Sequence, residues 1–237
     1  CLVGSEMCIR DSIGVAFDPS GPTFRHEAYE QYKAQREETP EAIRLSVPII
    51  KDIIRAYRIP ILEVSGYEAD DVIGTLATEA GRQGITTYMM TPDKDYGQLV
   101  SDRVFMYRPK HTGGFEVMGT EEVKTKFNIQ TTEQVIDMLG LMGDASDNIP
   151  GCPGVGEKTA QKLIAEFGSI ENLLEHTDQL KGALKTKVET NREMITFSKF
   201  LATIKTDVPI QLDMDSLVRE AVSYTHLRAH ETCADLV

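Results

Sequence analysis

Strand-like runs alternate with helical patterns through the first half of this chain of 237 residues. Apolar residues at helical spacing occupy residues 41–57 and 68–83, and Pro48 is expected to kink or divide the first of these helices. This alternation predicts a parallel, doubly wound α/β sheet. The runs expected to form strands, the first of them buried, are residues 13–17, 61–64, 85–90 and 104–107.

The pattern becomes helical beyond residue 120, after a hairpin-like turn at Gly113 and Gly114. We therefore expect an α/β core over residues 13–142 and a helical region over residues 143–222. The helices of this second half are expected at about residues 120–127, 131–142, 157–167, 170–176 and 186–203.

The two ends of the chain do not resemble its middle. Residues 1–12 lack a start methionine and carry two cysteines, and residues 223–237 hold another cysteine in a weakly periodic segment. Both segments are predicted to be foreign sequence joined to the gene. The alternative is that they are native, frayed termini.

The net charge of −12 is unusual for a protein that binds nucleic acid, because such proteins commonly carry basic patches. Carboxylates that bind divalent metals reverse the local charge, so the balance does not exclude nucleic acid. The four cysteines lack the spacing of a disulfide framework or a zinc site. With no signal peptide and no apolar run long enough to span a membrane, a cytoplasmic protein is expected.

Acidic residues follow three successive predicted strands, and two more lie near residue 145. Because the carboxyl ends of parallel strands meet at one edge of a sheet, we expect these side chains to converge. Too few lysines or arginines are expected nearby to neutralise them, so hard divalent cations such as Mg²⁺ or Mn²⁺ are predicted instead. Two such ions are typical of phosphodiester hydrolysis. The acids are Asp18, Glu68, Asp70, Asp71, Asp93, Asp95, Asp144 and Asp147.

Each group of acids also has a structural interpretation. Glu68 and Asp71 could be acids of a first helical turn, stabilised by the helix dipole, with Asp71 pointing away from its neighbours. Asp93 and Asp95 could be turn residues, and Asp18 could open the turn at Pro19. The shared edge of the sheet favours the metal site.

Basic and aromatic residues interleave over residues 24–38. A solvated amphipathic helix would show the same composition. Beside a metal site, Lys33 and Arg36 could steady a phosphate as charge develops on it, and Tyr29 or Tyr32 could stack on an unpaired base.

A turn rich in Gly and Pro, residues 151–159, leads directly into an apolar helical pattern. Glycines there would let backbone N–H groups approach a phosphate, and the helix N-terminus adds partial positive charge. The alternative is an ordinary surface turn. No dinucleotide-binding glycine motif or P-loop is present, so an enzyme that uses a nucleotide cofactor is not expected.

Four ordered segments resemble the 5′-nuclease family of flap endonucleases, and are most similar to the 5′→3′ exonuclease domain of bacterial DNA polymerase I. The similarity extends from about residue 13 to residue 222. The matching segments are VAFDPSGPTFRHEAYEQYKAQR, GYEADDVIGTLA, TPDKDYGQL and GDASDNIPGCPGVGEKTAQKL.

The resemblance implies a Rossmann-like (PIN-like) nuclease core followed by a helix–three-turn–helix element that binds DNA. It implies two Mg²⁺ ions held by the eight acids, and cleavage of DNA 5′ flaps or duplex 5′ ends, with removal of RNA primers. Lys33 and Arg36 would contact the scissile phosphate. The DNA-binding residues would be Arg25, Tyr29, Gly154, Gly156, Lys158 and Thr159, with a potassium ion at the turn.

The resemblance further implies a monomeric unit that works beside polymerase domains of a parent chain, in the bacterial cytoplasm and at the nucleoid. Family members begin with a strand that carries one more metal-binding aspartate, and nothing in residues 1–12 matches it. An N-terminally truncated fragment is therefore expected. There are two alternatives. One is a DNA-binding module without catalysis, and the other is a ribonuclease whose active site has the same group of acids.

Overall fold

Short strands form a two-stranded and a three-stranded sheet in the computed structural model of this chain, which describes residues 12–110 and 112–218. β1 (Val15–Ala16) pairs in parallel with β2 (Ile61–Leu62), and β3 (Thr87–Met90) pairs in parallel with β4 (Val104–Pro109). β5 (Phe115–Met118) returns antiparallel to β4, as the glycine turn predicts. The parallel α/β class is confirmed. Within the described residues, however, no ladder joins the two sheets into one.

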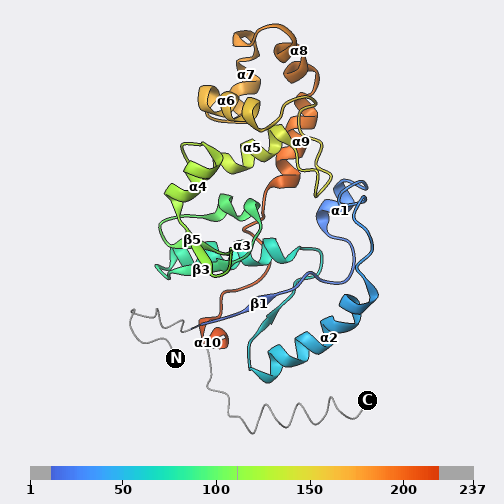
Figure 1. Ribbon diagram of the computed structural model, residues 1–237, viewed down its shortest axis with the longest axis vertical. Helices are drawn as coiled ribbons and strands as arrows, with labels where there is room; N and C mark the ends of the chain where they lie inside the picture. The colour runs from blue at the N-terminus through green and yellow to red at the C-terminus, as the bar shows by residue number, and fades with distance from the viewer. Residues whose placement is uncertain (1–11, 111, 219–237) are drawn as a thin grey trace.

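The helices of the α/β half pack around these strands (Figure 1). Pro48 does not divide its helix, which continues through it. The apolar face expected on that helix is largely exposed, including Ile43, Ile50 and Tyr57, and Ile13 before β1 is 40% exposed rather than buried. The elements are α1 (Phe24–Ala28), α2 (Glu41–Ala56), α3 (Ala69–Arg82), the 3₁₀ helix η1 (Lys94–Leu99) and α4 (Thr120–Phe127).

Most of the helical half lies toward the opposite end of the long axis from α2, but its last helix, residues 214–217, lies beside β1 at the α2 end (Figure 1). The single helix expected over residues 186–203 is two helices, because Asn191 interrupts it. The backbone N–H and the side-chain amide of Asn191 both donate to the carbonyl of Lys187, at 3.1 and 2.8 Å. The elements are α5 (Gln134–Met142), α6 (Glu157–Phe167), α7 (Ile170–Glu175), the 3₁₀ helix η2 (Thr177–Gln179), α8 (Gly182–Thr190), α9 (Arg192–Ala202) and α10 (Met214–Leu217).

Helix α5 is buried along most of its length and contributes to two apolar cores. Val135 and Leu139 pack with residues of β3 and β4, whereas Met138 and Leu141 pack among α6, α7, α8 and α9. Burial of such side chains contributes about 1.5–3 kcal/mol each. A domain boundary at residue 142 stays a prediction.

No helix in residues 12–110 or 112–218 is long and apolar enough to cross a membrane. The segments predicted to be foreign, residues 1–12 and 223–237, lie almost entirely outside the described residues.

The chain crosses from α5 toward α6 through closely packed backbone. Gly143 and Gly151 both have positive φ, and a Cβ atom at Gly151 would lie 2.3 Å from the Gly143 nitrogen. Gly151 N–H also donates to the hydroxyl of buried Ser198 at 3.0 Å. Only glycine therefore fits at this crossing without a backbone shift.

Gly151→Ala is expected to lower the free energy of unfolding. Backbone strain alone costs about 1–3 kcal/mol, and the overlap with the Gly143 backbone adds to this loss. Gly156→Ala is the matched control. Gly156 has φ −95° and no heavy atom within 4 Å of an added Cβ, so a change within about 0.5 kcal/mol is expected. Urea unfolding measures both, and equal losses in the two variants would contradict the packing argument.

Candidate active site

The guanidinium group of Arg25 is 2% exposed and joins three parts of the chain. Its Nη1 donates to Glu68 at 3.0 Å and to Asp71 at 2.8 Å, and its Nη2 donates to Asp71 at 2.8 Å. Its remaining donors bond to the carbonyls of Leu201, in the last turn of α9, and Thr203, just after it, at 2.9 and 2.7 Å. All five N–H donors of Arg25 therefore have acceptors inside the protein.

The side chain of Asp71 has no exposed surface and four hydrogen bonds. Besides the two bonds from Arg25, its oxygens accept the backbone N–H of Glu68 at 3.1 Å and that of Lys205 at 2.8 Å. These four bonds occupy the accepting positions of the carboxylate. The structure thus places Asp71 and Arg25 in a buried ion pair. The metal ligand predicted at Asp71 and the DNA contact predicted at Arg25 stay predictions.

The segment after α1 is bound to the loop that contains Asp147. Lys33 adopts φ 55°, and its backbone N–H donates to the carbonyl of Asp147 at 3.0 Å. Its ammonium group lies 2.6 Å from Glu68 Oε1 and 3.7 Å from Asp147 Oδ2. Arg36, which is exposed, bonds to the other Asp147 oxygen at 2.5 Å. Both predicted phosphate-binding cations thus lie at the acids.

Tyr32 is 3% exposed, and its hydroxyl donates to Glu68 and Asp147, at 3.0 Å each. Its burial and the neighbouring carboxylates raise its pKa above the ordinary tyrosine value. The prediction that Tyr32 stacks on a base is wrong, because its ring is inside the protein. Tyr29 is half-buried and packs edge-on against Phe197, with 5.6 Å between ring centroids, and its contact with DNA stays a prediction.

Asp144 is 6% exposed and has two partners. Lys94 Nζ lies 2.6 Å from Asp144 Oδ2, and Ser146 donates to Oδ1 through its backbone N–H at 2.7 Å and its hydroxyl at 2.5 Å. Burial works against the charge on Asp144, but the bonds from Lys94 and Ser146 outweigh it and lower the pKa of the carboxyl. Asp144 therefore keeps its negative charge to a lower pH than an ordinary aspartate does.

Asp95 has a buried oxygen, Oδ1, without a hydrogen-bond partner among the described residues. Burial raises the pKa of Asp95 to about 7, and the negative charges of Asp93, Asp144 and Asp147 add to the effect. A cation bound beside such a carboxylate would lower its pKa and stabilise its charged form.

Asp70 shows the same effect at the start of α3. Burial raises its pKa to about 6, with a contribution from the charge of Asp93, although Tyr96 donates to its Oδ1 at 2.7 Å. Asp18 and Asp93 are exposed and accept backbone N–H groups, from Ala69 at 2.8 Å and Asp95 at 3.0 Å.

The acids gather from the predicted segments, and four basic residues lie among them, which is half the number needed to neutralise eight carboxylates. Arg25, Lys33, Arg36 and Lys94 all form ion pairs with predicted site acids. In the part of the chain that the structure describes, no group of three or more His, Cys, Asp or Glu side chains has the geometry of a metal site.

The unpaired Asp95 oxygen nevertheless fits a cation, and carboxylate oxygens are the ligands that Mg²⁺ and Mn²⁺ prefer. The acids available to such ions are those outside the Arg25 ion pair. They are Asp18, Asp70, Asp93, Asp95, Asp144 and Asp147. Glu68 is paired with Arg25 through one oxygen, and its other oxygen is bonded to Lys33.

The predicted phosphate-binding turn is exposed at Gly154, Gly156 and Lys158. The N–H groups of Thr159 and Ala160 bond to the carbonyl of Gly156, whereas those of Gly156, Glu157 and Lys158 have no acceptor among the described residues. These donors face solvent at the start of α6.

Lys94, Tyr96 and Ser146 were not predicted as site residues. Each lies one or two positions from a predicted acid, which is the only signal that the sequence contains. Their roles depend on contacts between separate segments.

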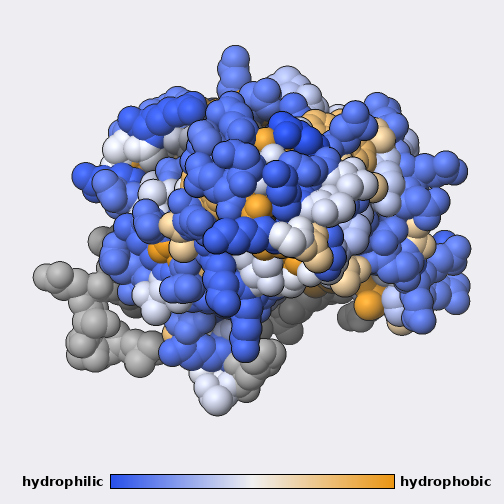
Figure 2. Space-filling view, turned by 90° about the horizontal axis from the view of Figure 1, so that it is seen from above, coloured by the Kyte–Doolittle hydropathy of each residue, from blue (hydrophilic) through white to orange (hydrophobic). Residues whose placement is uncertain are grey.

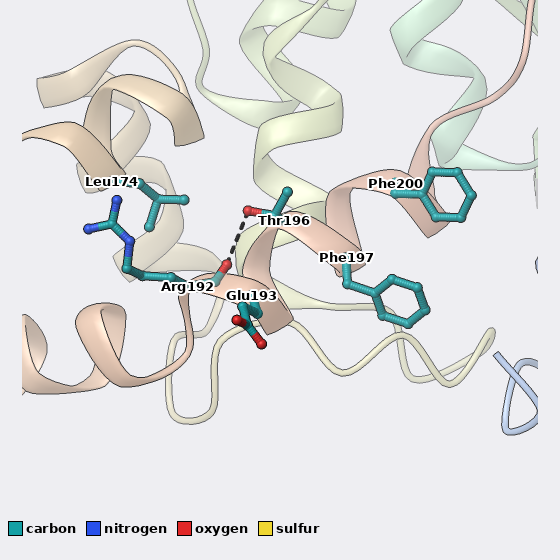
Figure 3. Close-up of a pocket in the computed structure, with 6 residues that line it drawn as sticks. All are labelled: Leu174, Arg192, Glu193, Thr196, Phe197 and Phe200. Carbon is teal, nitrogen blue, oxygen red and sulfur yellow. Dashed lines mark hydrogen bonds between the residues drawn. The ribbon is translucent and has the colours of Figure 1, made fainter. Parts of the chain in front are cut away.

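A hollow of about 480 Å³ is lined by side chains of α7 and α9 (Figure 3). Its lining has one carboxylate, Glu193, and none of the predicted site acids. The rings of Phe197 and Phe200 project from α9 beside it, and Thr196 donates to the carbonyl of Arg192 at 3.1 Å. It lacks the converging polar groups of a catalytic pocket.

Two family models match the chain. The first is described as "5'-3' exonuclease, N-terminal resolvase-like domain" and matches residues 5–128. The second, "5'-3' exonuclease, C-terminal SAM fold", matches residues 130–225. The chain belongs to the 5′-3′ exonuclease family.

Curated relatives of this family member are bacterial DNA polymerases. It is 45% identical to DNA polymerase I of Bacillus caldotenax over 205 residues, which is 86% of this chain and 23% of the relative. It is 42% identical to the thermostable DNA polymerase I of Thermus filiformis over 219 residues, 92% of this chain and 26% of the relative. The chain thus spans about a quarter of these relatives.

Solved structures share the fold. T5 5′-exonuclease with bound zinc has a TM-score of 0.70 at 23% identity, covering 92% of this chain and 81% of the other. The catalytic core of Rad2 in complex with DNA has a TM-score of 0.58 at 16% identity, covering 92% and 72%. These likenesses confirm the nuclease-type α/β architecture.

Arg25→Ala is expected to lower the free energy of unfolding by about 3–5 kcal/mol, because it leaves buried carboxylates without a counter-ion. Arg55→Ala is the matched control. Arg55 pairs with Asp52 on the exposed surface, so its loss should cost less than about 1 kcal/mol. Urea unfolding measures the free energy of unfolding of both variants. A similarly small loss of stability in each would contradict a structural role for Arg25.

The raised pKa of Asp95 predicts a pH-dependent stability of the metal-free protein. Between about pH 4, where an unfolded Asp titrates, and about pH 7, the folded chain retains a proton that the unfolded chain has released. Stability should therefore fall as the pH rises through this window.

Asp95→Asn removes this contribution, so its stability relative to wild type should increase from pH 5 to pH 8. Urea unfolding in EDTA at both pH values measures the difference. A difference that does not change with pH would show that Asp95 titrates normally.

Proposed function

We propose that this chain is a metal-dependent 5′ nuclease that hydrolyses phosphodiester bonds of DNA at 5′ flaps and duplex 5′ ends, and removes RNA primers. The observation that carries the proposal is the buried, unpaired oxygen of Asp95 among acids from separate segments, in a chain of the 5′-3′ exonuclease family. Such a group of acids is stable when cations bind it.

The metal ligands would be Asp70, Asp93, Asp95, Asp144 and Asp147, with Asp18 and Glu68 at the edge of the site. Two Mg²⁺ ions, or Mn²⁺ in their place, would supply a water of lowered pKa and neutralise charge on the departing oxygen. The carboxylates of the chain would hold and orient them. Tyr96 would keep the Asp70 carboxylate in position through its 2.7 Å bond.

Lys33 and Arg36 would act on the substrate phosphate. Both are fixed at the acids by their backbone or side-chain bonds to residues 146 and 147, and Arg36 also reaches the solvent. Their positive charge would stabilise the phosphate as negative charge develops on its oxygens.

The duplex would bind at the turn that contains Gly154, Gly156, Lys158 and Thr159. Free N–H groups at the start of α6 support this assignment, since DNA backbones are commonly bound by such donors. The potassium ion at this turn stays a prediction.

The parent protein would carry polymerase domains, as the curated relatives do. It also stays a prediction that the protein is a monomer and that it acts in the bacterial cytoplasm, at the nucleoid.

A labelled 5′-flap DNA incubated with the chain and Mg²⁺ should be cleaved near the junction, and EDTA should abolish the product. Asp95→Asn should lower the rate on the order of 100-fold or more, because it weakens metal binding. Asp52→Asn, an exposed acid on α2, should retain the wild-type rate.

Cleavage that persists in EDTA, or an unimpaired Asp95→Asn variant, would refute the proposal. Preference for an all-RNA flap substrate would favour the ribonuclease alternative, and salt-dependent duplex binding without any product would favour a DNA-binding module.

A further inference from the structure

Lys187 lies on α8, and its ammonium group rests on the turn that precedes α6. A Cβ atom added at Gly154 would lie 2.4 Å from Lys187 Nζ and 3.4 Å from its Cε. The ammonium is therefore packed directly against the Gly154 backbone, at a position with φ +76°. Both residues are exposed, so this contact is on the surface.

The position of Lys187 is set by its own helix. The next residue, Val188, is completely buried in the apolar core of the helical half. The carbonyl of Lys187 accepts two bonds from Asn191, which ends the helix. Lys187 also acts on Cys152, at the start of the turn: burial raises the pKa of the thiol, and the lysine charge opposes it.

The charge of Lys187 has no counter-ion among the described residues. No carboxylate lies within ion-pair distance of its ammonium, whereas Lys185 on the same helix lies 3.8 Å from Glu189. The whole face of the molecule seen from the end that carries α7 and α8 is mostly hydrophilic (Figure 2). An anionic partner suits this position better than an apolar one.

We propose that Lys187 is a further DNA-binding residue, whose ammonium group contacts a backbone phosphate of the duplex held at the turn 151–159. The inference rests on the proposed function of that turn. Lysine binds phosphate as a point charge with three N–H donors and reads no base. Lys187 would thus add affinity without sequence preference, from a helix separate from α6.

Binding of a fluorescent duplex to the full chain in EDTA, measured by anisotropy over a salt series, tests this role. Lys187→Ala should weaken binding several-fold and reduce the slope of log K against log salt by about 0.9, which is the loss of one phosphate contact. Lys187→Arg should restore the slope. Lys185→Ala, a matched lysine already paired with Glu189, should leave it unchanged.

Lys158→Ala separates the inference from the function on which it rests. If Lys158→Ala lowers affinity and slope while Lys187→Ala changes neither, the proposed duplex site stands and the role of Lys187 is refuted. If the wild-type chain shows no salt-dependent duplex binding, the proposed function fails, and the role of Lys187 with it.

Discussion

The buried bonds of Arg25 hold together the parts of this protein that form its site. A guanidinium removed from water loses several kcal/mol of solvation, which only well-placed acceptors can offset. Asp71 and Glu68 at the start of α3 provide two carboxylates, and the end of α9 and the residue after it provide the carbonyls of Leu201 and Thr203. Because α1 leads into the segment with Lys33 and Arg36, these bonds anchor the chain that carries both cations. Their own bonds to Asp147 and Ser146 then hold the two cations at the acids.

Neighbouring acids at the start of α3 have different environments. Asp71 faces inward and is neutralised by Arg25, whereas Asp70 has a raised pKa and, among the described residues, only Tyr96 as a side-chain donor. Consecutive helical residues point about 100° apart, so one can enter the core while the other faces the site. The proposed metal site therefore includes two acids, Asp70 and Asp95, whose charge the protein leaves without full compensation.

The loop from residue 143 to residue 160 connects this acidic site with the helical half. Asp144 and Asp147 lie at one end of it, and the exposed N–H donors at the start of α6 lie at the other. Gly143 and Gly151 let two segments of this loop pass each other with their backbones in contact. The proposed cleavage site and the proposed duplex-binding turn are thus separated by a short, constrained stretch of chain.

The sequence by itself determined the α/β class, the order and approximate bounds of most helices and strands, and the segments that bring acids together. Periodicity and the positions of glycine and acid residues contain that information, because they reflect local geometry. It did not determine the break at Asn191, the exposure of the apolar face of α2, or which acids are paired with arginine and lysine. Those features depend on contacts between segments far apart in the chain, such as Arg25 with Thr203, Lys33 with Asp147 and Lys187 with Gly154. Only the tertiary structure decided them, because burial and charge pairing are set by how the segments pack and not by the local pattern of any one of them.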